Sequence, residues 1–179
     1  MFRKTLITIT ILTFAFTALA VAADPTIIGA TKCKMCHKAK TGDQFQIWSD
    51  SGHAKAFETL KSEASIAIAT EKGLGNPWEE AACLKCHSTQ AFLGAEVDAT
   101  GKYDQIEGVS CEACHGAGSE YKAKKIMEDR AASVAAGMHL ADETTCLKCH
   151  NEESPTFKGF EYAAMWDKIK HPVPEAVAE

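Results

Sequence analysis

The stretch Cys33-Lys34-Met35-Cys36-His37 decides how this chain folds, because its pattern of two cysteines, two spacers and a final histidine recurs three times. Two thiols at this spacing add across the two vinyl groups of one haem, and the next residue, a histidine, then falls beneath the iron. The four copies use all eight cysteines, so the sequence predicts four covalently attached haem c groups. The other copies are Cys83-Leu84-Lys85-Cys86-His87, Cys111-Glu112-Ala113-Cys114-His115 and Cys146-Leu147-Lys148-Cys149-His150. We therefore expect His37, His87, His115 and His150 to be the proximal ligands of the four irons.

Two other uses of paired cysteines explain the sequence less well. A zinc ribbon takes two Cys-x-x-Cys knuckles per metal and needs no histidine after each one. A disulfide framework also leaves the four histidines unexplained.

The first 23 residues have the features of an export signal. Arg3 and Lys4 precede an apolar run over residues 6–19, and Ala22 and Ala23 suit signal-peptidase cleavage. The run is short of the roughly 20 apolar residues of a spanning helix. We therefore expect a cleaved signal at 1–23, a tetrahaem domain at 24–179, no stable membrane insertion, and a periplasmic or extracellular location.

Net charge argues against nucleic acid as a partner. The formal charge is −5, and removal of Arg3 and Lys4 with the signal makes it −7. The acidic surface either keeps the protein soluble or steers basic redox partners, and net charge alone does not distinguish these roles.

Helix formers dominate the segments between the motifs, and alternation of apolar and polar residues is rare. The predicted fold is a small, mainly α single domain with long loops, little or no β structure, and haem groups forming much of the core. The motif spacings of 50, 28 and 35 residues are uneven, which argues against a repeat array. Helices are expected at 44–61 with a break before Gly52, from Pro77 into the second motif, at 119–136 as the longest, and at 159–170.

The remaining histidines set a limit on iron ligation. Of seven histidines, the motifs use four, which leaves His53, His139 and His171 as predicted distal ligands. Three distal histidines cannot serve four irons, so one iron must be five-coordinate or take methionine, lysine, a terminal amine or water. Because residues 88–110 contain neither histidine nor methionine, the shortfall is predicted at the haem of His87. The methionine candidates are Met127, Met138 and Met165, for which core packing is the alternative interpretation.

Three stretches resemble the cytochrome c-554 family of multihaem cytochromes, and the resemblance covers nearly all of the chain after the signal. They are Trp48-Ser49-Asp50-Ser51-Gly52-His53-Ala54, Gly108-Val109-Ser110-Cys111-Glu112-Ala113-Cys114-His115-Gly116 and Cys146-Leu147-Lys148-Cys149-His150-Asn151.

The resemblance implies that His53 and His171, the latter in a His-Pro pair after the last haem helix, are distal ligands. It also implies three bis-histidine haems and a five-coordinate second haem, in a protein that accepts electrons from hydroxylamine oxidoreductase. The family pattern has a distal histidine between its second and third motifs, which this chain lacks, while this chain has His171 after its fourth. The pairing of haems with ligands and the physiological partner therefore do not carry over.

Three functions fit these features. The first is a periplasmic or exported electron carrier that passes single electrons between donor and acceptor proteins. The second is an oxidoreductase that acts on a small nitrogen or sulfur compound, such as nitric oxide or hydroxylamine, at the iron without a distal histidine. The third is a subunit of an extracellular haem filament or membrane-bound conduit. The sequence favours the carrier, since closely packed haems alone suffice for it.

Overall fold

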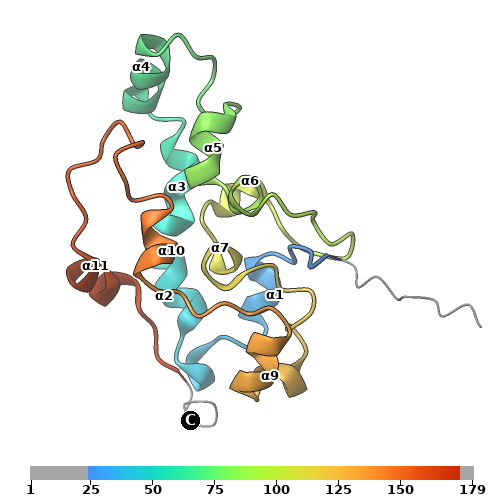
Figure 1. Cartoon of the computed structure of the whole chain (residues 1–179). Helices are drawn as coiled ribbons and strands as arrows, with labels where there is room; N and C mark the ends of the chain where they lie inside the picture. Colours follow the sequence, from blue (N-terminus) through green and yellow to red (C-terminus); the bar gives the residue numbers. More distant parts are fainter. Residues whose placement is uncertain (1–23, 174–179) are drawn as a thin grey trace, which may run out of the picture.

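The computed structural model describes residues 24–173, and the regular structure of this part is helical (Figure 1). The predicted export signal at 1–23 and the last six residues lie outside the described residues. Within 24–173 the β structure is a single isolated parallel bridge between Ile27 and Val97. The prediction of a mainly α fold with long loops is confirmed. The α-helices are α1 (Ala30–Lys34), α2 (Gln44–Asp50), α3 (Ala56–Thr59), α4 (Glu63–Glu71), α5 (Ala81–His87), α6 (Thr89–Leu93), α7 (Cys111–His115), α8 (Lys124–Met127), α9 (Arg130–Ala135), α10 (Glu143–Leu147) and α11 (Tyr162–Ile169).

The helices are short, and three 3₁₀ turns lie between them. The longest described helix, α4, has nine residues and is capped by Ser62, which precedes it and whose hydroxyl accepts the backbone N–H of Ser65. The 3₁₀ turns are η1 (Ala39–Thr41), η2 (His53–Lys55) and η3 (Gln105–Glu107). Among residues 24–173, none of the helices has the length and apolar character needed to cross a membrane.

The expected break in the segment 44–61 is confirmed. Helix α2 ends at Asp50, Ser51 has extended backbone, and its hydroxyl donates to the carbonyl of Trp48. The chain then continues through η2 into α3, which places His53 immediately after the break.

Three other helix predictions were wrong in extent. The segment 119–136 is not one long helix but α8 and α9, because the Asp129 side chain accepts the N–H of Ala132 and starts a new helix. The chain near Pro77 forms a turn, and α5 begins only at Ala81. Helix α11 begins at Tyr162 rather than Gly159 and ends before His171-Pro172.

Each haem motif lies on one turn of helix. Helices α5 and α7 contain the whole second and third motifs, whereas α1 and α10 end inside the first and fourth. In those two motifs the N–H of the histidine still bonds to the carbonyl of the first cysteine, at 3.0 Å for His37 and Cys33 and 2.9 Å for His150 and Cys146. A helical turn sets residues i, i+3 and i+4 on one face, so both thiols and the imidazole of a motif can reach one haem.

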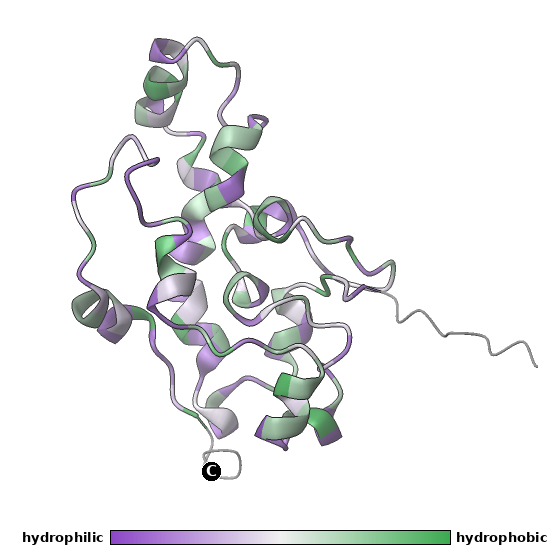
Figure 2. Cartoon of the chain, in the orientation of Figure 1, coloured by the Kyte–Doolittle hydropathy of each residue, from purple (hydrophilic) through white to green (hydrophobic). Residues whose placement is uncertain are grey.

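Few apolar side chains are buried among the described residues. They are Ile27, Ile28, Ala30, Leu60, Ala69, Ala113 and Tyr121. Figure 2 shows hydrophobic and hydrophilic residues mixed along the helices, with no continuous apolar layer between them. This agrees with the prediction that haem groups supply much of the core, since four large apolar macrocycles would pack against these short helices.

Candidate haem sites

The motifs come together in two pairs that their order in the sequence does not suggest. Cys33 of the first motif and Cys111 of the third interact directly, and Cys111 is the largest cause of the raised pKa of the Cys33 thiol. Cys149 of the fourth motif lies beside Cys86 of the second. Burial is the largest cause of the raised pKa of Cys149, and the neighbouring Cys86 is the next. The motifs therefore form a first–third pair and a second–fourth pair.

The two pairs meet through the third and fourth motifs. Burial raises the pKa of the Cys114 thiol to about 11, and the nearby thiol of Cys146 contributes next. The spatial order of the motifs is thus first, third, fourth, second. None of the eight cysteines forms a disulfide, so each is available for attachment to a haem vinyl group.

Two motif histidines are oriented by backbone carbonyls. His87 Nδ1 lies 2.6 Å from the carbonyl oxygen of Ala56, and His115 Nδ1 lies 2.9 Å from that of His139. A carbonyl can only accept, so each Nδ1 carries the proton and each Nε2 keeps a free lone pair. A hydrogen bond from the other ring nitrogen is the usual way in which proteins fix the orientation of a metal-binding imidazole.

Burial also favours the neutral form of four histidines. It is the largest cause of the lowered pKa of His37, His53, His115 and His150. Only the neutral imidazole binds a metal, so the donor set of these sites suits a haem iron.

His53 and His171 each lie close to a motif histidine. The ring centroids of His53 and His150 are 6.0 Å apart, and those of His115 and His171 are 5.9 Å apart. Two imidazoles on opposite sides of one metal, with metal–nitrogen bonds of about 2 Å, have centroids about 6 Å apart. The structure thus brings His53 to the fourth motif and His171 to the first–third pair.

Contacts made by Pro172 hold His171 in place. The side-chain amide of Gln44 donates to the Pro172 carbonyl at 3.1 Å. Pro172 also packs on Gly42, where an added Cβ would lie 3.0 Å from the proline Cβ. The segment after α11 therefore docks on the loop that follows the first motif, and His171 contributes to the lowered pKa of His37.

His139 belongs to the same half of the molecule. Its carbonyl accepts from His115, as described above, and its own N–H donates to the His115 carbonyl at 2.9 Å. Of the three histidines outside the motifs, His139 and His171 therefore lie with the first–third pair, and His53 faces His150. In the described part of the chain, no histidine ring is found packed against that of His87.

The Trp48–His53 segment is fixed to the third motif through Val109. Trp48 Nε1 donates to the Val109 carbonyl at 2.8 Å, and the Val109 N–H donates to the His53 carbonyl at 3.0 Å. These two bonds anchor the segment on both sides of the helix break and so hold His53 near His150.

Sequence reasoning missed two carboxylates behind the first–third pair. Glu112, a spacer residue of the third motif, is fully buried. Its carboxylate accepts the N–H groups of Ile28 at 2.9 Å, Gly29 at 2.8 Å and Gly118 at 2.7 Å. Glu107 accepts the N–H of Ala30 at 2.9 Å, and burial raises the pKa of Glu107 to about 7. These bonds hold the start of α1, which carries the first motif, against the third.

Comparison with known proteins agrees with the motifs. The family model described as cytochrome c554 and c-prime matches residues 32–116. Cytochrome c-554 of Nitrosomonas europaea is 30% identical over 158 residues, which cover 78% of this chain and 64% of that protein. The chain is similar to the cytochrome c-554 family. The solved structure of the reduced state of cytochrome c554 from Nitrosomonas europaea matches with a TM-score of 0.56 at 26% identity, covering 82% of this chain and 79% of that one.

These matches confirm the resemblance predicted from the motifs. They also confirm covalently bound haem c as the cofactor, and the prediction of four groups rests on the four motifs of the sequence. The chain spans 64% of the length of the curated cytochrome c-554 that it matches.

Proposed function

We propose that this protein is a periplasmic electron carrier that passes single electrons between redox partner proteins. The observation that carries the proposal is the continuous row of motifs, in the order first, third, fourth, second, with cysteines of successive motifs in contact or close together. Each haem iron, when bound, supplies one-electron oxidation and reduction.

The chain itself fixes the sites in that row. The cysteine pairs attach the cofactors, and the carbonyls of Ala56 and His139 orient His87 and His115. Glu112 ties the first motif to the third through its three backbone bonds. Rigid placement of this kind suits a carrier, because electron transfer needs no moving part between the sites.

We assign the distal histidines by their positions. His53 serves the iron of His150, which its ring faces at 6.0 Å. His139 and His171 divide the irons of His37 and His115 between them, since both lie in the first–third half. The iron of His87 is then left without a distal histidine.

That shortfall supports a second candidate function, in which a small molecule such as nitric oxide or hydroxylamine reacts at the iron of His87. The carbonyl that orients His87 comes from Ala56, three residues after His53, while the His53 ring faces His150. His53, the predicted distal histidine nearest in sequence to that carbonyl, is therefore assigned to the iron of His150 and not to that of His87.

A spectroelectrochemical titration of the exported holoprotein tests the carrier proposal. We expect all four haems to be reduced and reoxidised reversibly by small mediators, without net consumption of added hydroxylamine, nitrite or nitric oxide. Sustained turnover of one of these compounds would instead establish the second function. Haems that do not exchange electrons reversibly would overturn the carrier proposal.

A further inference from the structure

The first motif lies at one end of the row and carries an excess of positive charge. Between residues 30 and 47 the chain has four lysines, Lys32, Lys34, Lys38 and Lys40, and a single acidic residue, Asp43. The corresponding stretch around the fourth motif, residues 140–155, has the opposite balance, with four acidic residues and Lys148 alone. One motif region thus has a local charge of +3 and the other −3, in a chain whose net charge is −5.

These four lysines, which we call the lysine surface, are accessible. Lys34, Lys38 and Lys40 are exposed and Lys32 is half-exposed. None of the ion pairs found within residues 24–173 includes any of the four. Lys34 instead lies over the ring of Phe45, with Nζ 4.8 Å from the centroid, which holds its charge beside the motif.

An apolar group lies among the lysines. Met35, between the two motif cysteines, is 69% exposed and is the most exposed large apolar side chain in the described part of the chain. Cys36, one of the two haem attachment points of this motif, is also exposed. An apolar centre inside a charged rim is the usual composition of a protein–protein contact, and methionine is enriched in such centres.

We propose that the lysine surface is the docking site for an acidic redox protein, which it brings against the haem of the first motif. This inference rests on the proposed carrier function and adds the place and chemistry of one partner. Because the protein as a whole is acidic, an acidic partner is repelled over most of its surface and attracted at this one, so the charge selects the orientation as well as the partner.

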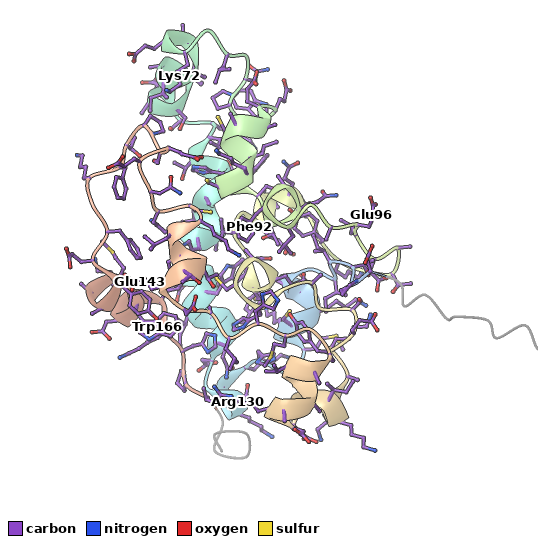
Figure 3. All side chains as sticks on the ribbon, viewed as in Figure 1. Lys72, Phe92, Glu96, Arg130, Glu143 and Trp166 are labelled. Atoms are coloured by element: carbon purple, nitrogen blue, oxygen red, sulfur yellow. The ribbon has the colours of Figure 1, made fainter. Side chains whose placement is uncertain are left out.

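The fourth motif, farther along the row, presents no such attraction. The acidic residues around the fourth motif are Asp142, Glu143, Glu152 and Glu153, all exposed, and Glu153 pairs with Lys85 of the second motif. Figure 3 shows Glu143 on α10, apart from α1 in the view. The opposite charges make the first and fourth motifs distinguishable to a charged partner.

Stopped-flow reduction of the oxidised holoprotein by reduced flavodoxin, a small acidic redox protein, tests the proposal. The test variant is Lys34→Gln/Lys38→Gln/Lys40→Gln. The control is Lys55→Gln/Lys61→Gln/Lys72→Gln, which removes the same charge from exposed lysines elsewhere, with Lys72 on the far side of the molecule from α1 (Figure 3). At low ionic strength we expect the test variant to lose about tenfold in second-order rate constant and the control at most about twofold. Raised salt should remove the difference.

A second measurement does not depend on electron transfer. Carbodiimide joins lysines to carboxylates of a bound partner, so cross-links between the holoprotein and oxidised flavodoxin should be concentrated in the peptides that contain Lys34, Lys38 and Lys40. Equal rate losses in the two variants, or cross-links spread over other lysines, would overturn the docking site while leaving the carrier function intact. Failure of dithionite to reduce the haems reversibly would overturn the carrier function itself.

Discussion

The first–third and second–fourth halves use the same five-residue motif but are held together differently. In the first–third half, the buried carboxylate of Glu112 binds three backbone N–H groups across the pair. In the second–fourth half, the side-chain link between the motifs is the exposed ion pair of Lys85 with Glu153. The difference teaches that the motif fixes the cofactor but not the strength of the scaffold, which comes from residues between and behind the motifs.

The largest difference in stability is expected between alanine substitutions at two glycines, Gly29 and Gly94. Gly29 has φ +86°, and an added Cβ would lie 2.6 Å from the carbonyl carbon of Lys102 and also clash with the Tyr103 nitrogen. Gly94 has φ +61° but no atom within 4 Å of its added Cβ. We expect Gly29→Ala to lower the free energy of unfolding by at least about 4 kcal/mol, against about 1 kcal/mol for Gly94→Ala.

Denaturant unfolding of the two holoprotein variants, followed by circular dichroism, measures these costs. Similar losses in both would mean that backbone near Tyr103 moves away easily and that the first–third half is not rigidly packed.

The next largest difference in stability is expected between variants of Glu112 and Glu153, the carboxylates that link the two motifs within each pair. Glu112→Gln replaces an acceptor of three backbone N–H groups by a neutral amide that can turn only one oxygen toward them, and we expect a loss of about 3 kcal/mol. Glu153→Gln removes one partner of an exposed ion pair and should cost less than about 1 kcal/mol. The same unfolding measurement applies, and a cost for Glu153→Gln that equals that for Glu112→Gln would contradict the comparison.

A smaller effect should appear in the pH dependence of stability. Burial raises the pKa of Glu107 from 4.5 to about 7, with the nearby charges of Glu112 and Asp104 acting in the same direction. Between these pH values the folded protein binds more protons than the unfolded chain, so the free energy of unfolding should fall as pH rises from about 4.5 to 7. Because the side chain is partly exposed, we expect a change of only about 1 kcal/mol.

The variant Glu107→Gln isolates this contribution. Its stability should lack the decline, which a series of denaturant unfolding curves between pH 4.5 and 7.5 would show as a flatter profile than that of the unchanged protein. An unaltered slope would assign the pH dependence to other groups.

The sequence predicts the cofactor and the fold class but not the arrangement of the motifs. The break after α2 could be read from Ser49–Gly52, because serine and glycine there favour a helix end. The split between α8 and α9 was missed, since helix-forming residues run through it and the cap at Asp129 decides the outcome. A signal for Glu112 was present, in the form of a lone acid inside the stretch Gly108–Gly116, but only the fold shows what it binds.

The order of the row could not be predicted from spacing. The second and third motifs are nearest in sequence, 28 residues apart, yet the thiol contacts join the first to the third and the second to the fourth. By contrast, the sequence did predict which iron lacks a distal histidine, because residues 88–110 contain neither histidine nor methionine. The distances of His53 and His171 to other motif histidines support the same placement at His87.

The central claim is that three irons have two histidine ligands and that the iron of His87 has one. Near-infrared magnetic circular dichroism with electron paramagnetic resonance on the oxidised holoprotein tests this claim most directly. We predict three low-spin bis-histidine irons and one high-spin iron that binds nitric oxide, with a second high-spin iron appearing in His53→Ala, as the assignment of His53 to His150 requires. Four low-spin irons in the unchanged protein, or a His53→Ala spectrum that still shows three bis-histidine irons, would contradict the account.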